Sequence, residues 1–159
     1  MTQVSDHLGT VTIGQEDPAQ PDIVRLLRNG EANSARLYPP ESSHHVSLAL
    51  LQRSGVRFLV ARDADGGALA TGAVVLHGEW AEIKRMWVEE AARRRGLAWR
   101  VLDALTSTAR KAGVEVLRLE TGVLNHAALA LYEKAGFRRR TPFASYRHDP
   151  LNVFMEKYI

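Results

Sequence analysis

The feature that most restricts the fold is a strongly periodic helix that follows a strand and a short arginine-rich loop. One apolar stripe at helical spacing is formed by Leu97, Val101, Leu102 and Leu105. Gly113 stands where a C-terminal cap is expected. Residues 80–88, before the loop, alternate as an extended strand does. A strand that leads through a tight loop into an amphipathic helix is typical of an α/β domain.

The rest of the chain supplies further strands and helices around this unit. Strands are predicted at 10–15, 56–61, 68–76, 114–119 and 151–157. The turn residues 65–67 make 56–61 and 68–76 an antiparallel hairpin. Helices are predicted after Pro21, interrupted at Asn29-Gly30, from Val46 to Leu51, and from an Asn125 cap to Ala135. Strands before, between and after helices predict a mixed sheet.

Composition limits the classes of protein that remain. The 159 residues, of which 45% are hydrophobic, predict one domain over 1–159. Cysteine is absent, which excludes disulfides, thiolate metal sites and a covalent intermediate on sulfur. The first thirty residues contain acids among scattered apolar residues and no long apolar run. We therefore expect a soluble, cytoplasmic protein that does not enter a membrane.

The loop before the main helix has the chemistry of an anion site. Gly96 and Ala98 leave the backbone N–H groups of the helix start accessible, at its positive dipole end. The three arginines 93–95 add countercharge with the fork geometry that phosphate groups favour. A solvated arginine-rich face is the alternative. Nucleic-acid binding is not predicted, because acids such as Glu89 and Glu90 interrupt the basic surface.

Two segments give the sequence a specific resemblance. Residues 93–98, Arg-Arg-Arg-Gly-Leu-Ala, match the motif Arg or Gln, two residues, Gly, one residue, Gly or Ala of the GCN5-related N-acetyltransferase (GNAT) family. Residues 125–137, ending Tyr-Glu-Lys-Ala-Gly-Phe, are similar to that family's later cofactor-binding segment. The resemblance covers about 56–157. Residues 82–86, 119–122 and 142–143 resemble a bacterial branch labelled as acting on auxin-type or amino-acid-like acceptors.

The resemblance implies a fold, a co-substrate and a reaction. The fold would be a single-domain α/β structure with a mixed central sheet of six to seven strands and about four helices. Acetyl-CoA would be the co-substrate, with no metal, and an amine would attack its thioester directly in a ternary complex. The absence of cysteine agrees with that route. The expected cofactor-binding residues are Met86, Trp87, Val88, Arg93, Arg94, Arg95, Gly96, Leu97, Ala98, Trp99 and Asn125.

Two catalytic residues are expected. The resemblance gives Tyr132 as the general acid toward the CoA thiolate, and its spacing from Asn125 places both on one helix face. Glu82 is the candidate base, because strict alternation would put it on the strand face of Met86, where the acetyl group would lie. A surface Glu82 paired with a neighbouring cation is the alternative. Histidines 44, 45 and 126, or water, are further candidates for the base.

The acceptor is specified least. It would be a primary amine of a small molecule or peptide. Tyr38, Arg85 and Thr121, with Tyr146, are expected to line its site, and Arg85 suits a substrate carboxylate. Homodimerisation and a longer acyl donor remain open. An acyl-CoA-binding sensor without turnover is the alternative function.

Overall fold

The computed structural model describes residues 10–42 and 47–159. These residues form a seven-stranded sheet of order β1-β2-β3-β4-β5-β7-β6. The strands are β1 (Thr12–Gln15), β2 (Val56–Arg62), β3 (Ala68–His77), β4 (Trp80–Val88), β5 (Val116–Gly122), β6 (Arg138–Arg140) and β7 (Asn152–Tyr158). The β4–β5 pair is parallel, whereas the neighbouring pairs on either side are antiparallel. The mixed α/β sheet expected from the sequence is confirmed.

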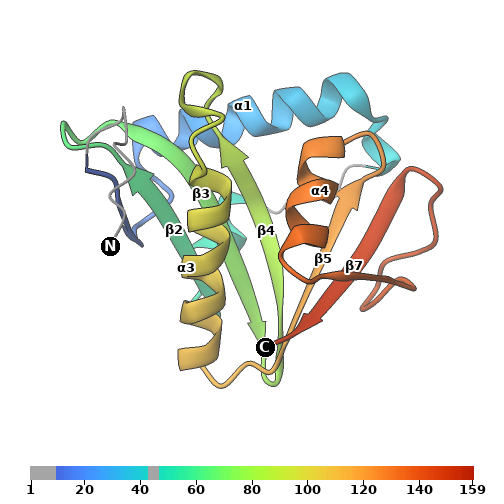
Figure 1. Cartoon of the computed structure of the whole chain (residues 1–159). Coiled ribbons are helices and arrows are strands. Elements are labelled where there is room, and N and C mark those ends of the chain that lie inside the picture. The colour runs from blue at the N-terminus through green and yellow to red at the C-terminus, as the bar shows by residue number, and fades with distance from the viewer. Residues whose placement is uncertain (1–9, 43–46) are drawn as a thin grey trace.

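Helices cover both faces of the sheet (Figure 1). They are α1 (Pro21–Leu37), α2 (Leu48–Leu51), α3 (Leu97–Lys111) and α4 (His126–Lys134), with single 3-10 turns at Pro40–Ser42 and Glu90–Ala92. Strand β2 shows how the faces divide: Leu59 packs in the core under α3, and Phe58 packs in the core under α1. In the described part of the chain, no helix combines the length and the apolarity that a membrane span requires.

Helix α1 runs without a break through Asn29 and Gly30, so the expected interruption there is wrong. A side chain at position 30 would meet the Trp87 ring at 3.6 Å, which shows how closely α1 lies on β4. The Asn29 amide also donates to Glu89 at 2.9 Å. These tertiary contacts offset the low helix propensity of the two residues, which costs about 1 kcal/mol for glycine.

Some elements begin or end at other residues than those predicted. Strand β6 lies where no strand was predicted, and it pairs with β7 through residues such as Arg140 and Phe154. Strand β5 continues to Gly122, beyond the predicted end at residue 119. Val46, where a second helix was expected to begin, lies outside the described residues. Helix α2 follows Ser47, whose hydroxyl accepts from the N–H of Leu50 at 3.2 Å.

Candidate active site

The candidate site occupies an opening between the two parallel strands. Pairing of β4 with β5 ends at Ile83 and Leu119, and Figure 1 shows the strands diverging beyond that point. A cavity of about 1290 Å³ fills the opening. Its walls come from α1, the second half of β4, the start of α3, the end of β5 and α4. The edge of β4 from Lys84 to Val88 therefore faces the cavity instead of a neighbouring strand.

A β-bulge in β4 changes which side chains share a face. The register with β3 shifts between Thr71 and Ala73, and Arg85 has a left-handed φ of 57°. Arg85 pairs with Glu31 of α1 on one face of the sheet, while Met86 packs in the core under α3 on the other. The prediction that Glu82 and Met86 share a strand face assumed strict alternation through β4. The bulge breaks this alternation, so the prediction is wrong.

The bulge aims a backbone donor into the cavity. The buried Thr71 hydroxyl donates to the carbonyl oxygen of Arg85 at 2.9 Å, so this carbonyl points toward β3. In a planar trans peptide the carbonyl and the following N–H point in opposite directions. The N–H of Met86 consequently points away from β3, toward the open edge of β4. A fixed donor in a cavity is suited to stabilising an oxyanion.

The start of α3 forms a second wall. Gly96 is the N-cap with φ of 75°, and Arg94 has φ of 64°. A Cβ on Gly96 would meet no protein atom within 4 Å, so the glycine is required by backbone conformation and not by crowding. The first N–H groups of α3 precede the helical ladder, whose first bond runs from Arg100 N–H to the Gly96 carbonyl at 3.1 Å. This arrangement suits a pyrophosphate group.

The three predicted arginines do not have the same surroundings. The Arg93 guanidinium donates to the Val88 carbonyl at 3.1 Å and lies 4.8 Å from the Trp87 ring centre, so it holds the end of β4. Arg94 and Arg95 are exposed and line the cavity with Leu97 and Ala98. Trp99 is 43% exposed there, with the Lys134 ammonium 5.5 Å from its ring centre.

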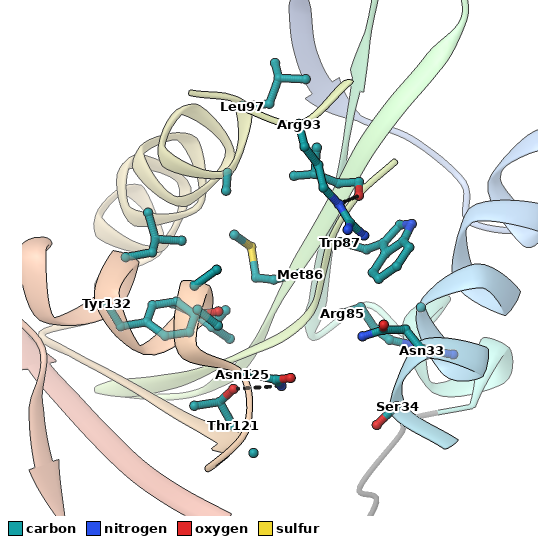
Figure 2. Close-up of a pocket in the computed structure, with 18 of the residues that line it drawn as sticks. Asn33, Ser34, Arg85, Met86, Trp87, Arg93, Leu97, Thr121, Asn125 and Tyr132 are labelled. Atoms are coloured by element: carbon teal, nitrogen blue, oxygen red, sulfur yellow. Dashed lines mark hydrogen bonds between the residues drawn. The ribbon is translucent and has the colours of Figure 1, made fainter. Parts of the chain in front are cut away.

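Helix α4 supplies Tyr132 and Asn125. Figure 2 shows Tyr132 across the cavity from Arg85 and Trp87. The Tyr132 ring is buried, packs edge-on to Phe137, and burial raises the pKa of its hydroxyl. Asn125 stands at the N-cap position, but its side chain does not cap the helix; its amide donates to the Thr121 hydroxyl at 3.4 Å. The predicted side-chain cap is therefore wrong, and this amide lies at the cavity wall.

Glu120 lines the cavity, although it was not predicted as a site residue. Burial raises the pKa of its carboxyl to about 7; the positive charge of Lys84 opposes this shift, and the negative charge of Glu82 adds to it. A carboxyl that titrates near neutrality is a suitable general base. Glu120 was missed because the strand was predicted to end at residue 119. Extending the alternation of apolar Leu117 and Leu119 by one residue would have placed it on the strand.

Glu82 is buried beside the cavity and takes part in a polar network. Its carboxylate accepts from the Tyr146 hydroxyl at 2.5 Å and lies 3.3 Å from the Lys84 ammonium. Lys84 also donates to the Tyr146 hydroxyl at 2.5 Å. Lys84 lines the cavity, whereas Glu82 and Tyr146 are not among the lining residues. The network ties β4 to the loop between β6 and β7.

The other predicted acceptor residues lie on different walls. The Tyr38 hydroxyl accepts from the N–H of Leu124 at 3.0 Å, and its ring occupies the space beside Gly122 where a Cβ would stand. Tyr38 thus closes the wall between α1 and β5. Thr121 lies on the α4 side, and Arg85 on the α1 side. His126 lines the cavity, and histidines 44 and 45 lie outside the described residues.

The chain is similar to known acetyltransferases in sequence and in fold. Residues 26–137 match the model of the acetyltransferase (GNAT) family. An IAA acetyltransferase of Azospirillum brasilense is 42% identical over 149 residues, which cover 92% of this chain and 97% of that protein. A crystal structure from Klebsiella pneumoniae, assigned as an acyl-CoA N-acyltransferase, superposes with a TM-score of 0.80 at 34% identity, covering 94% of this chain and 97% of that one.

A further solved structure shares the fold and contains coenzyme A. This N-acetyltransferase of Thermoplasma acidophilum, in complex with coenzyme A, gives a TM-score of 0.74 at 16% identity and covers 94% of this chain and 99% of that one. The strand opening, the family match and the relatives lead to one assignment. The chain belongs to the acetyltransferase (GNAT) family and is an N-acetyltransferase.

Proposed function

We propose that the protein transfers an acetyl group from acetyl-CoA to a primary amine of a small molecule or peptide, by direct attack in a ternary complex. The observation that carries the proposal is the open edge of β4, where the Met86 N–H faces a cavity that also contains Tyr132 and Glu120. A donor, an acid and a base around one space are the groups that acyl transfer to an amine requires.

Acetyl-CoA would extend along the cavity. The pyrophosphate would bind the N–H groups at the start of α3, with Arg94 and Arg95 as countercharges. The pantetheine arm would lie along β4 from Met86 to Val88, in the manner of an added strand. The acetyl oxygen would then accept from the Met86 N–H. A donor of this kind is worth about 3 kcal/mol of activation free energy.

The proton transfers are assigned to Glu120 and Tyr132. The amine nitrogen bonds to the thioester carbon while its proton passes to Glu120, directly or through water. The carbon–sulfur bond breaks, and the departing thiolate takes a proton from the Tyr132 hydroxyl. The Tyr132 hydroxyl is protonated at neutral pH, since burial only raises its pKa, so the proton is there to be donated. We prefer Glu120 over Glu82 as the base because Glu120 lines the cavity, whereas the Glu82 carboxylate is bound by Tyr146 and Lys84.

The first experiment is thiol release from acetyl-CoA with a panel of amines, with the acetylated product identified by mass spectrometry. IAA is assayed separately from the amines, because the Azospirillum relative is named as an IAA acetyltransferase. Tight binding of acetyl-CoA by calorimetry without thiol release for any acceptor would instead identify an acyl-CoA sensor. Recovery of a longer acyl-CoA from the purified protein, used faster than acetyl-CoA, would correct the donor.

A further inference from the structure

Arg85 is a buried cation that lines the cavity. Its side chain is 7% exposed and projects from the bulge of β4 to the α1 side. Figure 2 shows it beside Asn33, with Trp87 and Ser34 on the same wall and Tyr132 opposite. A guanidinium in such a position presents a rigid fork of donors that matches the two oxygens of a carboxylate.

Glu31, which forms an ion pair with Arg85, is poorly shielded from water. Glu31 of α1 pairs with the Arg85 guanidinium, but the Glu31 side chain is 45% exposed. A half-exposed carboxylate such as that of Glu31 regains its hydration when another anion takes its place. Leaving a buried guanidinium without an anion, in contrast, costs much more free energy. An incoming carboxylate can therefore displace Glu31 at little cost.

The backbone at Arg85 gives an independent reason to expect a role for its side chain. Its φ of 57° lies in the left-handed region, where glycine carries no steric penalty. A side chain there carries a steric penalty. The chain nevertheless has arginine at this position, facing the cavity. The second cation on this wall, Lys84, is engaged by Glu82 and Tyr146 and ties down a loop.

We propose that Arg85 binds a carboxylate of the acceptor in place of Glu31, so that the acceptor is an amino acid or another amine that carries a carboxylate. The amine would lie toward Glu120, which stands on β5 across the opening. The inference rests on the proposed function, and it adds the chemical class of the acceptor.

The test compares matched substrates and three variants. L-Amino acids and their amides are assayed in pairs, and the ratio of kcat/KM for acid over amide is measured. The different amine pKa values of each pair cancel when this ratio is compared between proteins. Wild type should prefer the acid. Arg85→Gln should lower the ratio on the order of tenfold to a hundredfold, the range for a hydrogen bond to a charged group.

Glu31→Gln separates substrate binding from a structural ion pair. It removes the competitor of the substrate carboxylate, so the ratio should stay or rise. Arg118→Gln is the control, because Arg118 pairs with Glu156 outside the cavity lining; it should leave the ratio unchanged. If Arg85→Gln does not fold, Arg85→Lys, which keeps the charge and loses the fork, should lower the ratio less. An equal loss in Glu31→Gln and Arg85→Gln, or no acid preference in wild type, would overturn the proposal.

A binding measurement keeps this inference distinct from acetyl transfer itself. Calorimetry of N-acetylamino acids and their amides against the CoA-loaded protein needs no turnover. Acid-selective binding that Arg85→Gln abolishes, with no acetylation of any amine, would reject the transferase and retain the carboxylate site. Acetylation of amines without acid selectivity in either measurement would retain the transferase and reject the carboxylate site.

Discussion

The Thr71 hydroxyl of β3 donates a hydrogen bond of 2.9 Å to the backbone carbonyl of Arg85 in β4. Thr71 is fully buried, and the bond lies where the register between the two strands shifts. A bulge leaves a peptide group without its regular ladder partner. Here a side chain supplies that partner, fixes the peptide plane, and with it the direction of the Met86 N–H.

The first prediction follows from this bond. Thr71→Val keeps the shape of the side chain and leaves the Arg85 carbonyl without its donor, so stability should fall by about 1–3 kcal/mol. A misdirected Met86 N–H should lower kcat by up to about a hundredfold, with acetyl-CoA affinity nearly unchanged. Thr71→Ser is the matched control, because it keeps the hydroxyl. Steady-state kinetics, calorimetry and thermal unfolding check these outcomes, and an undiminished kcat in Thr71→Val would contradict the role.

The sequence predicted the parts of the site that depend on local pattern. The helix from Leu97 was evident from its apolar stripe, and the placement of Tyr132 on a cavity-facing helix followed from the motif. The bulge was not predictable, because no glycine marks Arg85 and period-two alternation carries no sign of an inserted residue. That one residue reversed the placement of Glu82 relative to Met86. Glu120 was not predicted as a site residue because the predicted strand ended three residues before the observed end of β5.

The second prediction concerns the anion site at Gly96. Gly96→Glu fills open space at the start of α3 with bulk and negative charge, so acetyl-CoA affinity should be lost. Gly113 provides a matched control at the other end of α3, since it too has a positive φ and open space around its Cβ. Gly113→Glu should strain the backbone comparably and leave acetyl-CoA affinity intact. Calorimetry on both folded variants measures this, and equal affinities would place the cofactor elsewhere.

The third prediction concerns Tyr132. Tyr132→Phe keeps the ring that packs against Phe137 and removes only the hydroxyl. If Tyr132 protonates the thiolate, kcat should fall on the order of a hundredfold, with little change in the dissociation constant of acetyl-CoA. Stopped-flow and steady-state thiol release measure the rate. Equal kcat values for both proteins across the pH range would show that the hydroxyl has a packing role alone.

The last prediction concerns Glu120, whose pKa of about 7 makes it an effective base only above neutrality. In wild type, kcat/KM for one amine should rise through pH 7 and level off, and in Glu120→Gln that limb should disappear.

A substrate amine that titrates near pH 7 could produce the same limb. The stability of the protein is therefore measured as well, because that measurement needs no amine substrate. A carboxyl with a raised native pKa stabilises the fold while protonated, so this contribution is complete below pH 4.5 and is lost by about pH 7. Thermal unfolding should therefore show Glu120→Gln gaining stability relative to wild type across that window. A limb that persists in Glu120→Gln and vanishes in Glu82→Gln would make Glu82 the base instead.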